Sequence, residues 1–232
     1  MLRDSGGHRT KLTVRKFDDL DHYLDWLCGL RKPLEEVPIV GNIFLDEGIG
    51  ALLALAIGDA ETAFSNANAR LGVGDGGLTA LTGTLTFTNG SAAVTGTSTL
   101  FTSELAAGDW VQLDADGELY RVESITSDTA MTLERLYAGT GGTGAGSAIS
   151  PLETGLKGAN TLYKAMETGY PQRSGTTVTF RSVFGDTEAN FQWLEFTVDN
   201  GAAAGKNWNR KVQDAGTKSG GTWTLDLQIT LQ

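Results

Sequence analysis

The chain has 232 residues, of which 28 are acidic and 18 are basic, so its formal net charge is −10. Such a chain lacks the general basic surface that would neutralise phosphates, which argues against nucleic acid as a partner. Its 31 glycines, only 4 prolines and abundant threonine favour many short strands joined by tight turns. Composition therefore predicts a mainly β protein that folds as one large domain or two small ones.

The polar N-terminus has no apolar stretch of the kind found in a secretory signal. The longest apolar run, from Ile49 to Ile57, is about half the ~20 residues that a helix needs to cross a bilayer. We therefore expect no membrane contact. The single cysteine, Cys28, cannot close an intramolecular disulfide, which fits assembly in a reducing cytoplasm.

The N-terminal segment is predicted to contain a short strand at residues 12–16 and a helix at residues 18–28, which Gly29 ends. The helix has one apolar face, formed by Phe17, Leu20, Leu24 and Leu27. We expect that apolar face to be buried against another surface. We expect residues 1–41 to form an arm whose apolar face contacts another subunit. Trp208 and Arg210, which have polar neighbours, are expected in the same partner interface.

A second helix is predicted to begin near Asn42, which is a good cap, and to end at Gly58. Its apolar positions are spaced for one buried face, at Leu45, Ile49, Leu52, Leu53 and Ala56. Polar residues are almost absent after Glu47. We therefore expect this helix to be buried on more than one side, packed across a sheet.

Strand periodicity begins at Leu85, and Asn89-Gly90 and Asp116-Gly117 are typical of hairpin turns. Glycine-rich stretches at residues 72–77 and 139–146 flank this region. Residues 78–150 are therefore predicted to form an inserted small β-barrel or Ig-like module.

The main domain, residues 42–77 plus 151–232, is predicted to be a β-sandwich-like core with one or two helices. Its clearest strand is at residues 222–231, where apolar and polar residues alternate so that one face is buried. The apolar residues of this strand are Trp223, Leu225, Leu227, Ile229 and Leu231.

Several segments of the main domain, taken in order, resemble a family of tailed-bacteriophage virion proteins. They are residues 42–49 (NIFLDEGI), 63–69 (AFSNANA), 71–75 (LGVGD), 164–166 (KAM), 169–171 (GYP), 188–193 (EANFQW), 207–212 (NWNRKV) and 216–218 (GTK). In that family the segment matching residues 71–75 runs through a short loop into the part matching residues 158–161. This chain departs from the pattern by an insertion of about seventy residues.

The insertion itself resembles a small β module that recurs as an addition to phage particle proteins. The similarity is carried by residues 94–97 (VTGT), 101–102 (FT), 108–110 (GDW) and 120–122 (YRV). The two resemblances imply a non-enzymatic virion protein, assembled in the bacterial host cytoplasm. It would be homo-oligomeric and would bind the major capsid protein or tail proteins. A capsid decoration or cement protein on the head surface is favoured, and a tail-fibre or baseplate adaptor or other tail accessory protein is the alternative.

Residues 72–77 (GVGDGG) match the GxGxxG pattern, which cradles a pyrophosphate only when it joins a strand to a helix. Threonine-rich strand sequence follows here, so we interpret the pattern as the turn at which the insertion departs. The two histidines, His8 and His22, lie far from any serine or cysteine motif. Cys28 is expected to be structural, and with these few ligands the usual zinc sites are excluded.

The acidic side chains offer two further candidates, a calcium site and a catalytic pair. The hairpin acids Asp114, Asp116 and Glu118 form a shorter series than a calcium loop requires. Asp186 and Glu188 are interpreted as solvated turn acids. We therefore expect no enzyme activity, no cofactor and no metal. Trp193, Trp208 and Trp223 could form a platform for sugars, so a glycan-binding module remains a second alternative, although such residues are more often core.

Overall fold

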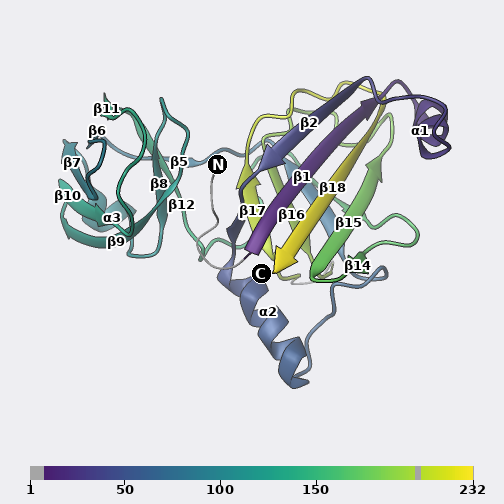
Figure 1. The fold of residues 1–232 in the computed structure, drawn as a ribbon, viewed down its shortest axis with the longest axis horizontal. Coiled ribbons are helices and arrows are strands. Elements are labelled where there is room, and N and C mark those ends of the chain that lie inside the picture. Colours follow the sequence, from purple (N-terminus) through teal and green to yellow (C-terminus); the bar gives the residue numbers. More distant parts are fainter. Residues whose placement is uncertain (1–7, 202–204, 232) are drawn as a thin grey trace. The chain divides into compact units, whose positions relative to one another are not determined.

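The computed structural model describes residues 8–201 and 205–231, which form two compact units (Figure 1). The first unit combines the residues up to Gly77 with those from Thr154 onward, and the second covers Leu78–Glu153. The inserted module thus extends slightly further than the expected residues 78–150. The second unit is thus an insertion in the chain of the first.

The first unit is a sandwich of two antiparallel five-stranded sheets, as the sequence predicts (Figure 1). The first sheet, in spatial order, consists of β14 (Gln172–Ser174), β15 (Thr177–Phe184), β18 (Thr222–Leu231), β1 (His8–Phe17) and β2 (Glu35–Val40). The second sheet consists of β13 (Thr161–Ala165), β4 (Arg70–Gly74), β16 (Glu195–Asp199), β17 (Asn209–Val212) and β3 (Ile43–Phe44). Apolar side chains from both sheets join in a single core.

Strand β18 is central because its apolar residues from Trp223 to Ile229 face the core; Leu231 at its end was expected there too but is 53% exposed. Leu225 and Leu227 are fully buried, and they pair with Val14 and Leu12 of β1. The expectation that residues 1–41 form an arm is therefore wrong for the described part of that segment. Strand β1 lies between β18 and β2 and supplies core residues to the same sheet.

Helix α1 (Leu20–Leu27) follows β1 directly. The side chain of Asp19 accepts a hydrogen bond from the backbone N–H of His22 and caps its first turn, and Gly29 follows with a left-handed φ of +74°. The helix turns Tyr23 and His22 inward, whereas its leucines point outward. The N-terminal helix was thus predicted correctly, but its buried face is aromatic.

Helix α2 (Asp46–Ile57) begins later than expected, because Asn42 precedes strand β3 and Leu45 stands at the helix start without a side-chain cap. The prediction that α2 is buried on more than one side is wrong. Among its residues only Gly48 and Ala51 are buried. A Cβ on Gly48 would lie 2.2 Å from the Cα of Trp208. This glycine therefore lets the first turn of α2 pack against the backbone just before β17, while the rest of the helix projects outward.

The second unit is an eight-stranded antiparallel sheet around its own apolar core. In chain order its strands are β5 (Thr79–Ala80), β6 (Thr84–Phe87), β7 (Ala93–Thr97), β8 (Trp110–Leu113), β9 (Tyr120–Ser127), β10 (Ala130–Leu133), β11 (Gly142–Gly144) and β12 (Gly146–Ile149). The short helix α3 (Phe101–Glu104) joins β7 to β8. Asn89-Gly90 connects β6 to β7, and Asp116-Gly117 connects β8 to β9, as their turn chemistry predicts.

Within residues 8–201 and 205–231, none of the helices is both long enough and apolar enough to span a membrane.

Candidate functional site

The residues considered for catalysis or metal binding do not come together. Across the described part of the chain there is no group of three His, Cys, Asp or Glu side chains that could hold a metal ion. Cys28 is exposed at the end of α1. His22 is buried, with its Nε2 2.7 Å from the carbonyl of Lys32, while the side chain of His8 lies outside the described residues.

Asp186 and Glu188, between β15 and β16, accept hydrogen bonds from the backbone of turn residues. Asp186 accepts a hydrogen bond of 2.8 Å from the backbone N–H of Gly221. Glu188 accepts one of 2.8 Å from Gly185 and is also paired with Lys164, and these contacts lower the pKa of the Glu188 carboxyl although partial burial opposes them. Both carboxylates are thus occupied by structural partners.

A shallow open depression beside these turns is lined by Lys16, Phe17, Glu35, Asp186 and Trp223, among others. Its charged side chains already have partners. The ammonium of Lys16 lies 2.7 Å from the carboxylate of Glu35 and 4.5 Å from the centre of the Trp223 ring. No nucleophile with an adjacent base lines it.

The GxGxxG pattern provides room for a buried carboxylate. Strand β4 carries Gly72 and Gly74, and a Cβ on Gly74 would lie 2.5 Å from Oε1 of Glu195. A Cβ on Gly76 would lie 2.4 Å from the backbone nitrogen of Gly158. The chain continues into β5, with no helix between, so there is no positive helix end for a phosphate. These glycines are required by close packing.

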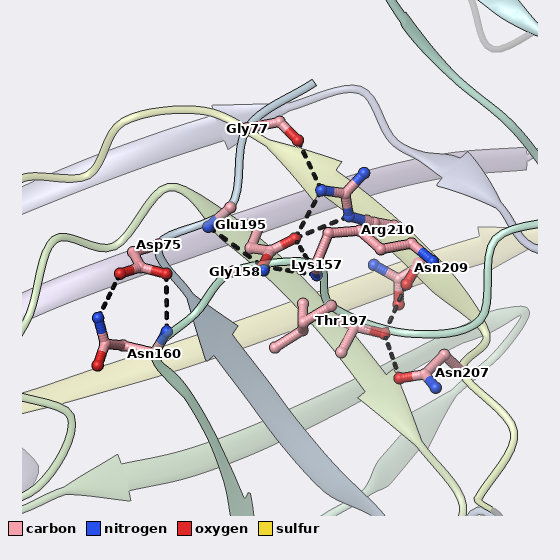
Figure 2. Close-up of polar contacts among 12 residues, drawn as sticks. Asp75, Gly77, Lys157, Gly158, Asn160, Glu195, Thr197, Asn207, Asn209 and Arg210 are labelled. Carbon is pink, nitrogen blue, oxygen red and sulfur yellow. Dashed lines mark hydrogen bonds and ion pairs between the residues drawn. The ribbon is translucent and has the colours of Figure 1, made fainter. Parts of the chain in front are cut away.

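Glu195 and Arg210 form a fully buried ion pair, which sequence reasoning missed (Figure 2). Two nitrogens of the Arg210 guanidinium lie 2.8 and 2.7 Å from Oε2 of Glu195. The other carboxylate oxygen accepts hydrogen bonds from the backbone N–H groups of Gly76, Lys157 and Gly158, at 3.2, 2.9 and 2.7 Å. The expectation that Arg210 lies in a partner interface is therefore wrong, because it is 1% exposed within the chain.

This pair ties the segment that leaves the first unit to the segment that returns to it. The Arg210 guanidinium donates a 2.7 Å hydrogen bond to the carbonyl of Gly77, while Lys157 and Gly158 belong to the returning segment. Beside it, the Asp75 carboxylate accepts hydrogen bonds from the backbone and side chain of Asn160, at 2.9 and 2.6 Å (Figure 2). We call these residues the junction clamp: Asp75, Gly76, Gly77, Lys157, Gly158, Asn160, Glu195 and Arg210.

Trp208 is 5% exposed, so the expectation that it lies on the surface in a partner interface is also wrong. Its ring packs against those of Phe44, Phe64 and Phe180, with centroids 5.2 to 6.1 Å away. Trp193 and Trp223 are likewise buried. These three tryptophans therefore form no exposed platform on which a sugar could stack.

Helix α1 is held by aromatic and charged side chains. Phe17, which was expected to face a partner, is 2% exposed and packs against Tyr23 and Trp26. Trp26 lies 5.0 and 5.2 Å from the guanidinium groups of Arg15 and Arg181. The prediction for Phe17 is wrong because this residue belongs to the docking contact of α1.

The hydroxyl of Tyr23 donates a hydrogen bond to Glu167, which anchors α1 to the turn after β13. Burial and this carboxylate raise the pKa of the Tyr23 hydroxyl above its ordinary value. The helix is thus fixed on the sandwich, and its outward residues form a defined surface.

Among the described residues of the first unit, most of the exposed large apolar side chains lie in two surfaces. The α1 patch consists of leucines from α1 and the segment after it: Leu20, Leu24, Leu27, Leu30 and Leu34. The α2 stripe consists of residues four apart on one side of α2: Ile49, Leu53 and Ile57. Leu20, Leu24 and Leu27 were expected to contact a partner; they are exposed as that contact requires, and the contact itself stays a prediction. Sequence reasoning missed the α2 stripe because it placed α2 in the core.

Comparisons of the chain with protein-family models, with curated proteins and with solved structures return no match.

Proposed function

We propose that this protein is a non-enzymatic structural component of a tailed-phage virion that binds the particle lattice as a capsid decoration or cement protein. The observation that carries the proposal is the exposure of apolar side chains on two helices of one rigid sandwich. Leu53 is 62% exposed and Ile57 is 77% exposed, although the helix that carries them has no polar side chain after Glu47. Helices that leave several large apolar side chains exposed are typical of protein contact surfaces.

The energetic argument favours contact over permanent exposure. Burial of one leucine or isoleucine side chain contributes about 1.5–3 kcal/mol. The α1 patch and the α2 stripe together hold eight such residues. Burial of these side chains against a partner contributes to association and opposes the translational and rotational entropy that association costs. The buried charged groups, by contrast, have partners inside the chain and are not placed to act on a substrate.

The resemblance of the main domain and of the insertion to phage particle proteins supports a virion location. Partners are then other virion proteins, either the major capsid protein or tail proteins. A tail-fibre or baseplate adaptor is the second candidate. It is favoured by one observation: α1 and α2, which carry exposed leucine and isoleucine side chains, lie at different ends of the sandwich, as in a protein that connects two others (Figure 1).

The experiment is co-sedimentation of purified protein with particles of the encoding phage that lack it. Wild-type protein should sediment with the particles. Leu24→Asp and Leu53→Asp, which place a charge in the α1 patch or the α2 stripe, should weaken attachment at least about tenfold. Leu136→Asp is the matched control, because Leu136 is 64% exposed on the second unit.

Attachment of both patch variants at the wild-type level would contradict the proposal. If particles lacking tail retain attachment, the head location holds; if only tailed particles or isolated tails bind, the adaptor is correct.

A further inference from the structure

Lys218, in the connection between β17 and β18, is a buried lysine whose amino group contacts the amide of Asn190. Lys218 is 1% exposed, although lysine is rarely buried without a charged partner. Its Nζ atom lies 3.0 Å from Oδ1 of Asn190, and it also donates to the carbonyls of Gly185 and Asp186, at 2.7 and 3.4 Å. These three acceptors are neutral amide oxygens, so the hydrogen bonds bring the amine to an amide and not to a carboxylate.

The backbone segments that carry the two side chains are bonded to each other. The backbone N–H of Lys218 donates to the carbonyl of Phe191 at 3.0 Å, and Gln192 forms an antiparallel bridge with Thr217. Because both segments are fixed, the amine is held against the amide carbonyl. An intramolecular reaction gains most over its bimolecular counterpart when the two groups are held in this way.

The amide of Asn190 is held at both of its ends. Its Oδ1 accepts a hydrogen bond of 3.2 Å from the backbone N–H of Gly220, and its Nδ2 donates one of 3.0 Å to the carbonyl of Asp186. The Gly220 N–H is therefore in place to stabilise negative charge on Oδ1. The carboxylate of Asp186 is close by, because a Cβ on Gly220 would lie 3.2 Å from its Oδ1.

The surroundings of Lys218 favour the reactive form of the amine. An amine is a nucleophile when it has lost its extra proton, and desolvation of a lysine promotes that loss. Burial lowers the pKa of the Lys218 ammonium below its ordinary value, although the carboxylates of Asp186 and Glu188 oppose this change. A larger fraction of neutral amine is therefore present at Lys218 than at a lysine in water.

We propose that Lys218 and Asn190 join in an intramolecular isopeptide bond. The neutral Nζ attacks Cγ of Asn190, and the bond between Cγ and Nδ2 breaks. One proton passes from Nζ to Nδ2 by way of the Asp186 carboxylate, so the leaving group departs as ammonia. The products are a secondary amide and one ammonia, and the reaction requires no oxidant, metal or cofactor. This inference goes beyond the proposed function and does not depend on particle attachment.

The intact mass of the purified full-length protein tests the proposal. Wild-type protein should be lighter than its sequence by one ammonia. Lys218→Arg keeps the positive charge and the hydrogen-bond donors but has no nucleophilic amine, so it should have the full mass of its sequence. Lys164→Arg is the matched control, because Lys164 pairs with Glu188, and this variant should lose ammonia as wild type does.

Tryptic digestion locates the bond. Trypsin does not cleave after a lysine whose side chain is an amide, so the wild-type digest should contain one branched peptide that joins residues 182–206 to residues 212–232. Cyclisation of Asn190 onto its own backbone also releases ammonia. That reaction would leave the two peptides separate and would persist in Lys218→Arg, so the digest distinguishes it from the isopeptide bond.

The role of Asp186 in the proton transfer has a separate test. Asp186→Asn should slow formation of the bond at least about tenfold, so freshly purified protein should contain chains that have kept the ammonia. Incubation at higher pH should then complete the reaction, because it supplies neutral amine without the carboxylate. Complete linkage in fresh Asp186→Asn would exclude Asp186 from the proton transfer.

Wild-type protein of full sequence mass, with trypsin cleavage after Lys218, would overturn the inference. Loss of ammonia that persists in Lys218→Arg would overturn it as well. In either case Lys218 would be an ammonium that holds the turn at residues 185–190 through hydrogen bonds alone.

Discussion

The junction clamp and helix α2 both differ in burial from what their sequences indicate: the charged residues of the clamp are buried, and the apolar residues of α2 are exposed. The clamp places a carboxylate and a guanidinium where water does not reach, and α2 places isoleucine and leucine where water does. The clamp is satisfied inside the chain, because Glu195 has a cation and three backbone N–H groups as partners. The α2 stripe has no equivalent partner among the described residues. The difference teaches that burial follows the available partner, and under the proposed function the partner of α2 belongs to another molecule.

The largest expected effect is at the clamp. Arg210→Met leaves the Glu195 carboxylate buried without its cation, so the free energy of unfolding should fall by about 3–5 kcal/mol. Urea unfolding measures it. The matched control is Arg121→Met, which breaks an exposed pair with Glu134 and should cost no more than about 1 kcal/mol. Equal losses in the two variants would show that burial of the pair has no energetic importance.

The second largest loss of stability is expected where glycines pack closely against the clamp. Gly74→Ala places a methyl group 2.5 Å from Oε1 of Glu195, which must shift, so the free energy of unfolding should fall by about 1–3 kcal/mol. Gly77→Ala is the control, because a Cβ there meets no atom within 4 Å. If Gly74→Ala unfolds at the same temperature as the control, close packing against Glu195 does not require a glycine at this position.

Removal of the second unit should have a smaller effect on the first. The segments that leave and return meet at Gly76 and Gly158, so a short Gly/Ser linker in place of Leu78–Glu153 should leave the clamp intact. We expect a folded sandwich with one cooperative unfolding transition within about 1 kcal/mol of the full chain's first unit. An insoluble product or a transition without cooperativity would mean that the second unit is part of the first unit's fold.

The smallest effect concerns pH. Hydrogen bonds from Asn160 lower the pKa of the Asp75 carboxyl below its ordinary 3.8. A lowered pKa in the folded state gives stability that is present above the unfolded value and is lost as pH falls through the folded value. Asp75→Asn should therefore show a shallower decline of stability below about pH 4 than wild type. Identical acid-unfolding profiles of the two proteins would show that the hydrogen bonds of Asp75 contribute nothing to stability.

Local patterns predicted much of the fold. The alternation in β18 and the turn dipeptides at Asn89-Gly90 and Asp116-Gly117 depend on neighbouring residues, so they could be recognised in one sequence. The place of β1 could not, because its partner β18 is more than two hundred residues away. The supposed arm was an error of the same origin.

The clamp was missed for a related reason. Glu195 and Asp199 alternate with Phe196 and Val198, which normally indicates a strand with one wet face. The returning segment that contains Lys157 covers Glu195, Arg70 pairs with Asp199, and both acids are buried. The available signal was the presence of arginines in neighbouring strands, because Arg210 pairs with Glu195 and Arg70 with Asp199.

The central claim is that the exposed apolar helices are contact surfaces in an assembled particle. The most direct measurement is hydrogen–deuterium exchange of the free protein and of the protein attached to particles. The account predicts that amides of Asp46–Ile57 and Leu20–Leu27 exchange more slowly after attachment, because a covered helix opens less often. Unchanged exchange in both helices, with protection confined to the second unit or to the outer faces of the sheets, would contradict it.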